Sequence, residues 1–325
     1  MSTMFLKVIR ALTFAGTVAL APWANAQDAW PKDTITWVAV TAPGGNSDVL
    51  ARLIGQPLSE KLGVSVVVEN RPGAGGIVAG SYVLSSPADG YKLFGGGSAA
   101  NVISPLTNAN IPYDVQKDFA PVTLLGVNYN VLVVPADSPF KTVADIVAEA
   151  KKNPRSVSYA SPAIGGSQHM SGELLKQLAG IDLVHTPNSR GAAIMDVIGG
   201  HVSMMFEGPA AMTHIQSGAV RALAVTSKTR LPQLPDVPTM EEAGVPGFEV
   251  MAWQGIFVKA GTPEAVIDRL QKEVKAIIET PAMRERLEKM GLKPSGMTPA
   301  ELVAFQKAET DKWATVVEAA GLRKQ

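Results

Sequence analysis

The sequence predicts an α/β fold in which two domains each contain a mostly parallel sheet. Short apolar strands alternate with helices along almost the whole chain, and this alternation is typical of parallel sheets covered by helices on both faces. Several strands are followed directly by glycine-rich turns. Without the first 26 residues, which have the pattern of an export signal, the chain has 299 residues. This length suits two domains of ordinary size. Its 46% of hydrophobic residues provides enough material for two cores.

The first 26 residues have the pattern of a cleavable export signal. Lys7 and Arg10 precede an apolar run of 11 residues, and the segment ends in Ala24-Asn25-Ala26. A basic start, a short apolar core and such an ending indicate secretion, whereas a membrane-spanning helix needs about 20 apolar residues. The chain contains no cysteine, so a lipid-bearing cysteine, disulfides and thiolate metal ligands are excluded. We therefore expect a product that is free in the periplasm.

The charges of the chain are balanced, with 29 Lys and Arg against 29 Asp and Glu. Loss of the leader removes two basic residues and leaves a net charge of −2. Without basic runs there is no electrostatic pattern for a nucleic-acid partner. The histidines show no metal-ligand spacing, so we expect neither a metal nor a cofactor. They are His169, His185, His201 and His214.

Three strands and two helices are expected before residue 95. Pro57 lies inside the first helix and should kink it or end its regular part. The expected strands are 34–41, 64–69 and 91–94, the first two of them buried, and the expected helices are 47–62 and 77–85.

The second half repeats this rhythm. Thr142 and Asp145 form a capping box at the start of one helix, and Gly180 is the left-handed end of another. The expected strands are 131–134, 157–160, 183–185, 202–206 and 220–226, and the helices are 143–152 and 167–179. Three closing helices should each begin with a capping threonine before a proline, at Thr262-Pro263, Thr280-Pro281 and Thr298-Pro299, the last with Glu301 completing a capping box.

Glycine-rich turns at the carboxyl ends of strands are the candidate binding loops. In Pro43-Gly44-Gly45-Asn46-Ser47-Asp48 the backbone can approach a ligand, and the helix start offers unpaired N–H groups that suit a carboxylate or a phosphate. An ordinary turn capped by Ser47 or Asp48 is the alternative. The run from Gly73 to Gly76 fails the dinucleotide spacing because Val78 occupies the last glycine position, so a tight helix-entry turn is favoured there.

Two serines beside glycines raise the alternative of a secreted hydrolase. They are Ser98, after Gly95-Gly96-Gly97, and Ser167, after Gly165-Gly166. Neither has the G-x-S-x-G pattern. Ser167 and His169 lie two residues apart at a helix start, so their side chains should diverge. We therefore expect a binding protein rather than an enzyme.

Eight motifs occur in a distinctive order between about residue 30 and the C-terminal helix. They are Pro43-Gly44-Gly45 with Asp48 and Ala51-Arg52, the run 66–76 that ends in Glu69-Asn70-Arg71-Pro72-Gly73-Ala74-Gly75-Gly76, Ala88-Asp89-Gly90-Tyr91, the run 117–122, Tyr159-Ala160-Ser161, Gly172-Glu173-Leu174, the run 221–227 and the run 234–239. With these motifs the chain resembles the substrate-binding proteins of tripartite tricarboxylate transporters, the Bug family. The run that begins at Glu69 is the most specific of them.

The resemblance implies a Venus-flytrap fold, with a ligand crevice between two α/β domains. It also implies capture of a small carboxylate for the membrane subunits of a transporter. We expect residues 27–128 and 251–325 to form domain 1 and residues 129–250 to form domain 2, in a monomeric protein. In the family two loops approach one carboxylate, largely through backbone N–H groups and waters. The matching residues are Gly44, Gly45, Asn46, Asp48, Ser161, Ala163, Gly165, Ser167 and His169, to which we add Ser98, Asn188, Arg190 and Glu207 as candidates.

The chain departs from the family pattern at two places that should select the rest of the ligand. After His185 the family usually has Val-Pro-Tyr, but here the chain reads Thr186-Pro187-Asn188-Ser189-Arg190-Gly191, and after Phe206 it has Glu207 instead of aspartate. Arg190 either holds a second carboxylate with a two-pronged contact or lies solvated on the surface. The ligand stays open between an aliphatic di- or tricarboxylate and an aromatic acid. A sensor that signals to a membrane partner is a further alternative.

The export signal gives a direct prediction. The protein isolated from the periplasm should begin at Gln27 and stay soluble without detergent, because the leader ends in a cleavage motif and carries no cysteine for a lipid. N-terminal sequencing checks this, and a periplasmic product that keeps residues 1–26 would contradict it.

Overall fold

The computed structural model describes residues 30–188 and 193–323. The expected export signal lies outside these residues, and so does Arg190.

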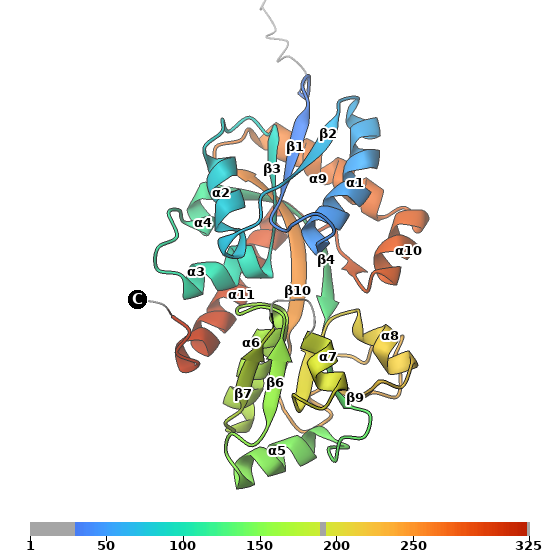
Figure 1. The fold of residues 1–325 in the computed structure, drawn as a ribbon. Helices are drawn as coiled ribbons and strands as arrows, with labels where there is room; N and C mark the ends of the chain where they lie inside the picture. The colour runs from blue at the N-terminus through green and yellow to red at the C-terminus, as the bar shows by residue number, and fades with distance from the viewer. Residues whose placement is uncertain (1–29, 189–192, 324–325) are drawn as a thin grey trace, which may run out of the picture. The chain divides into compact units, whose positions relative to one another are not determined.

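A six-stranded sheet contains the first and last parts of the chain (Figure 1). Its strand order is β11-β4-β10-β3-β1-β2. β1 pairs in parallel with β2 and β3, whereas β10 is antiparallel to both β3 and β4. The strands are β1 (Ile35–Ala39), β2 (Val66–Asn70), β3 (Lys92–Gly97), β4 (Phe119–Tyr129), β10 (Met251–Lys259) and β11 (Lys293–Pro294).

Helices from both ends of the chain pack against this sheet. α1 contacts the parallel strands and α9, and α11 contacts β4. The helices are α1 (Asn46–Leu62), η1 (Ala74–Gly76), α2 (Ile77–Leu84), η2 (Ala99–Ile103), α3 (Ser104–Thr107), α4 (Val115–Asp118), α9 (Glu264–Ile278), α10 (Pro281–Lys289) and α11 (Pro299–Ala319).

A five-stranded sheet contains the middle of the chain, with the order β7-β6-β8-β5-β9. β6 is parallel to β7 and β8, whereas β5 is antiparallel to β8 and β9. Its strands are β5 (Val131–Pro135), β6 (Ser158–Ser161), β7 (Val184–Pro187), β8 (Met204–Glu207) and β9 (Val220–Val225). The accompanying helices are α5 (Val143–Lys152), α6 (Ser167–Ala179), α7 (Ala193–Ile198) and α8 (Ala211–Gln216).

The expectation of mostly parallel sheets is wrong, because β10 in the first sheet and β5 in the second run antiparallel to the strands of the βαβ units. β4 and β10 form the longest antiparallel ladder of the six-stranded sheet, and neither strand was predicted. Pro121 and Gly126 interrupt the pattern of β4, and Gln254 and Gly255 interrupt that of β10. A strand broken in this way does not show the alternation by which strands are identified from sequence.

Four local expectations are corrected. β2 is not buried: it is the edge of its sheet, and Val67 is 51% exposed. α1 covers the expected range and continues through Pro57 to Leu62, so of the two alternatives at Pro57 the end of the helix is wrong, and a kink stays a prediction. Pro263 has a non-helical ψ of 136°, so it is itself the N-cap of α9 and Thr262 does not cap that helix.

The fourth correction concerns β3. This strand does not end at Phe94 but runs on through the three glycines to Gly97. Both capping boxes, the Thr280 cap and the left-handed Gly180 are confirmed. The alternative of a cap by Ser47 or Asp48 is wrong, because Gly45 is the N-cap of α1 and provides no side-chain cap.

The chain passes between the sheets at Asn130, which is fully buried. Asn130 N–H donates to Thr226 Oγ1 over 2.9 Å, and Thr226 N–H donates back to the Asn130 carbonyl over 2.9 Å. The Thr226 hydroxyl also donates to the Val250 carbonyl over 2.6 Å, so both crossing segments are bonded to one residue. The residues from Pro31 onward form one compact unit, and the domain limits near 128 and 250 stay a prediction.

Two helical glycines give a matched stability test. A Cβ on Gly172 would collide with the ring of Tyr159, which is fully buried, whereas a Cβ on Gly55 would meet Val66 Cγ1 at 3.4 Å, an ordinary contact. Gly172→Ala should therefore destabilise the protein by about 1–3 kcal/mol. Gly55→Ala should be neutral or stabilise it by up to about 1 kcal/mol. Urea unfolding measures both, and equal effects would contradict the packing described for α6.

Candidate functional site

Two glycine turns, one beside each sheet, have the same backbone geometry. In the first turn Gly44 is left-handed with φ +83°, and Gly45 caps α1 with φ −75° and ψ 163°. In the second turn Gly165 has φ +80°, and Gly166 caps α6 with φ −72° and ψ 163°. The positive φ values explain the first glycine of each pair, since residues with a Cβ rarely adopt them.

The same hydrogen bond holds each turn in place. Gly44 N–H donates to Asp48 Oδ2 over 2.9 Å, and Gly165 N–H donates to His169 Nδ1 over 3.1 Å. In both cases the acceptor belongs to the third residue of the helix. This structural repeat was not predicted, although its signal is present in the sequence as a glycine pair with a side-chain acceptor three positions after the second glycine.

Both turns end in free helix starts of the kind that binds anions. The N–H groups of Asn46 and Ser47 in α1, and of Ser167 and Gln168 in α6, belong to first turns that have no intrahelical acceptors. Together with the positive end of the helix dipole, such groups bind carboxylates and phosphates. Gly44 and Asn46 are exposed, and Ser167 and Gln168 are partly exposed.

Asp48 fixes the first turn from within. The side chain is 3% exposed, and its Oδ1 accepts from Arg52 at 3.0 Å and from Asn70 at 2.9 Å. Arg52, the Gly44 N–H and Asn70 lower the pKa of Asp48 to about 2, against the opposing effect of burial. With its oxygens taken up by these groups, Asp48 positions the turn, and direct contact between Asp48 and a ligand stays a prediction.

The glycine run after Asn70 packs against η2. A Cβ on Gly76 would lie 2.5 Å from Ala100 Cβ, and Ser104 Oγ donates to the Gly75 carbonyl over 2.9 Å. Asn70 itself donates to the Thr41 carbonyl over 2.9 Å. The most specific motif of the chain therefore braces the first turn and η2, as a tight helix-entry turn.

Ser98 lies where β3 passes into η2, a π-helix, and π-helical turns are frequent at functional sites. It is partly buried, and its φ and ψ of −50° and −46° are helical. At the other end of η2, Ile103 approaches the second glycine turn, since a Cβ on Gly165 would lie 3.2 Å from Ile103 Cγ2. η2 therefore connects the end of β3 with the turn at Gly165.

Ser161 is fully buried and positions the second turn. Its Oγ lies 3.2 Å from the Ala163 carbonyl and 2.7 Å from His185 Nε2. The Ala163 carbonyl in turn accepts from Gly166 N–H at 3.4 Å. The predicted contact of Ser161 and Ala163 with a ligand stays a prediction.

A stack of rings supports this turn. The His185 ring lies 4.8 Å from that of Tyr159 and 4.1 Å from that of His169. Burial lowers the pKa of both histidines, that of His185 to about 4 with the help of the neighbouring His169. His169 Nδ1 therefore stays free to accept the Gly165 N–H, as the turn requires.

The remaining candidates lie at the ends of β7 and β8. Asn188 Nδ2 donates to Asp196 over 2.6 Å, and Asn188 N–H donates to the Ser161 carbonyl over 2.9 Å. Glu207 is partly buried and accepts from Gly208 N–H at 2.7 Å. Burial raises the pKa of Glu207, although Gly208, His214 and the Gln168 side chain oppose the shift.

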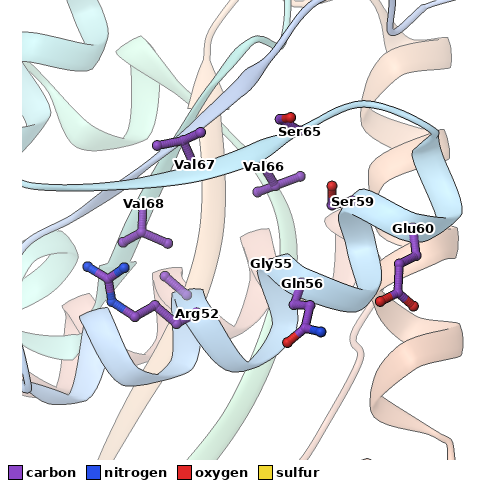
Figure 2. A pocket seen from close by; sticks show the side chains of 10 residues that line it. Arg52, Gly55, Gln56, Ser59, Glu60, Ser65, Val66, Val67 and Val68 are labelled. Carbon is purple, nitrogen blue, oxygen red and sulfur yellow. The ribbon is translucent and has the colours of Figure 1, made fainter.

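A surface groove lies apart from these residues, between α1 and the edge strand β2 (Figure 2). Val66 and Val68 point toward α1, whereas Val67 points to the opposite side of the strand. Arg52 lines the groove, but none of the predicted ligand residues does. Within residues 30–188 and 193–323, His, Cys, Asp and Glu side chains do not gather in threes as a metal site would require. No helix in this part of the chain is long and apolar enough to cross a membrane.

The sequence of residues 50–322 matches the tripartite tricarboxylate transporter family receptor, TctC. The chain belongs to this family. It is 40% identical over 293 residues to the "UPF0065 protein in tcbD-tcbE intergenic region" of a Pseudomonas species, covering 89% of this chain and 87% of that protein. It is 33% identical to Protein BugT of Bordetella pertussis, covering 95% and 96% of the two chains.

Solved structures of TctC-type receptors share the fold. A Rhodopseudomonas palustris protein with adipate is 34% identical with a TM-score of 0.80, over 90% of this chain and 99% of that one. MatC of Rhodopseudomonas palustris with bound malate is 31% identical with a TM-score of 0.76, over 89% and 100%. The periplasmic binding protein BugD is 32% identical with a TM-score of 0.77, over 91% and 100%. The two-sheet TctC fold expected from the sequence is confirmed.

The lowered pKa of Asp48 predicts acid-sensitive stability. The folded-state pKa lies below the unfolded value, so the stabilisation is complete above about pH 4 and is lost as the pH falls toward about 2. Asp48→Asn should cost about 1 kcal/mol near neutral pH, a modest value because Arg52 is 55% exposed. Urea unfolding at about pH 7 and about pH 3 measures the difference in the free energy of unfolding between wild type and variant, and this difference should be smaller at the lower pH. An equal difference in the free energy of unfolding at both pH values would contradict the lowered pKa of Asp48.

Proposed function

We propose that the protein captures a small carboxylate in the periplasm and delivers it to the membrane subunits of a tripartite tricarboxylate transporter. The pair of matching glycine turns is the observation that carries the proposal, because each presents unpaired N–H groups at a helix start. Membership of the TctC receptor family supports the same function. So do the ligands of its relatives, since adipate and malate are both small dicarboxylates.

The N–H groups of the two turns suffice for capture. A hydrogen bond to a charged group contributes roughly 1.5–3 kcal/mol, so three or four supply about the 8 kcal/mol of a micromolar Kd before the costs of closure. We infer that Asn46 and Ser47 bind from the first turn and Ser167 and Gln168 from the second. Closure follows in this proposal because a ligand that touches both turns binds the closed arrangement better than the open one.

Binding without catalysis is part of the proposal. Ser161 does contact His185 at 2.7 Å, which is the spacing of a nucleophile and its base. However, Ser161 is fully buried, and the low pKa of His185 reflects burial rather than an orienting carboxylate. Ser167 Oγ contacts Gln168 and Asn130, neither of which is a base. We therefore propose that the protein does not hydrolyse esters.

A single backbone donor can be removed to test the site. Asn46 is the first residue of α1, a position where proline is well tolerated, and Gly45 has the extended ψ that precedes proline. Asn46→Pro therefore deletes the Asn46 N–H and leaves the helix intact. Binding should weaken at least tenfold, about 1.4 kcal/mol.

The matched control is Asn46→Ala, which keeps the N–H and removes the side chain. A thermal-shift screen of malate, succinate, adipate and benzoate first selects the tightest ligand, and calorimetric titration then compares the three proteins. Asn46→Ala should lose much less affinity than Asn46→Pro. If Asn46→Pro binds like wild type at an unchanged melting temperature, the first turn does not hold the carboxylate. If no carboxylate in the panel binds wild type, the proposed function fails.

A further inference from the structure

Glu207 is a partly buried carboxyl group near the start of α6, and the proposed capture of a carboxylate does not use it. It ends β8, and the side chain of Gln168 in the first turn of α6 is one of the groups that lower its pKa. The adjacent Gly208 is buried, with its Cβ position 3.9 Å from both Gln168 Nε2 and Asn130 Oδ1. Asn130 Oδ1 in turn accepts from Ser167 Oγ at 3.5 Å. A ligand carboxylate that accepts from Ser167 and Gln168 N–H would therefore bind the same helix start that the end of β8 approaches.

Asp48 in α1 and Glu207 at the end of β8 have opposite surroundings. Asp48 receives the guanidinium of Arg52, an amide and a backbone N–H. Glu207 accepts one backbone N–H, the neutral amide of Gln168 acts to lower its pKa, and among the described residues no Lys or Arg is paired with it. The pKa of Asp48 is lowered to about 2, whereas burial raises that of Glu207.

We propose that Glu207 is a proton-binding site coupled to the ligand site, so that the protein takes up a carboxylate together with a proton. The inference rests on the proposed function. Two carboxylates that share a site cannot both stay ionised at low cost, and the pKa of one of them rises. Glu207 is the group that takes the proton because, in the part of the chain that the structure describes, it is not paired with a cation as Asp48 is with Arg52.

The other titratable groups around Glu207 are few in the described part of the chain. Among the described residues, α8 presents His214, whose electrostatic interaction opposes the rise in the pKa of Glu207. α6 contributes the neutral Gln168, while its Glu173 is bound to Tyr159 and Lys176. From α7, Asp196 accepts from Asn188, and from β5, opposite Glu207, comes the apolar Val131. His214 is therefore the group that the experiment has to separate from Glu207.

The direction of the pH effect follows from proton uptake. A bound anion raises the pKa of Glu207 above its value in the free protein. Between these two pKa values binding takes up a proton, so affinity falls as the pH rises, by at most tenfold per pH unit. Below the lower pKa Glu207 is already protonated, and above the higher one it stays ionised, so affinity levels off on both sides.

Calorimetric titration in two buffers with different ionisation enthalpies measures the proton count directly. The full protein is titrated with the tightest ligand of the malate, succinate, adipate and benzoate panel in HEPES and in imidazole, from about pH 6.5 to about pH 8, where the free ligands are ionised. Wild type should take up a measurable fraction of one proton. Glu207→Gln should take up none, should lose the pH dependence of its Kd, and should bind at least as tightly as wild type at the upper pH.

His214→Gln is the matched control and should keep the proton uptake of wild type. Circular dichroism and melting temperatures establish that both variants are folded. Tight binding by wild type without proton uptake over this range would overturn the inference and leave the proposed function intact. Uptake that persists in Glu207→Gln, or that disappears in His214→Gln alone, would overturn it as well. Absence of binding by every ligand of the panel would overturn both.

Discussion

The site depends on one hydrogen bond that occurs twice. In each glycine turn the N–H of a left-handed glycine donates to the side chain of the third helical residue, Asp48 or His169. This bond fixes the path of the backbone before the helix, where the next N–H groups belong to a first turn that has no intrahelical acceptors. Anion binding then requires no cationic side chain, because the backbone and the helix dipole provide the positive potential.

The two acceptors differ in charge, and their surroundings maintain the difference. Asp48 is ionised because Arg52 and Asn70 bond it. The negative charge next to the first turn is therefore neutralised by the guanidinium of Arg52. His169 accepts at Nδ1 and is kept neutral by burial within the stack of Tyr159 and His185. In the described part of the chain two carboxyl groups lie near the second turn. Glu173 is bound to Tyr159 and Lys176, whereas Glu207 is paired with no lysine or arginine there, which makes the ionisation of Glu207 important.

Much of this arrangement was predictable from local sequence. The glycine pairs, the capping boxes and the helices 143–152 and 167–179 follow from residue preferences that act within a few positions. Two kinds of feature could not be predicted from local sequence. β4 and β10 depend on pairing between segments more than 120 residues apart, which no local pattern encodes. The inward roles of Asp48 and Ser161 depend on neighbours that the fold brings together, namely Asn70 and His185.

The position of β10 also constrains the order in which the chain can fold. This strand lies between β3 and β4 in the six-stranded sheet, although it follows them by more than 120 residues. A nascent chain that ends before Met251 therefore lacks the central strand of its first sheet. Such long-range pairing slows folding and delays it until synthesis is nearly complete. For a chain that we propose to cross the inner membrane, this delay favours a loosely structured, translocation-competent precursor.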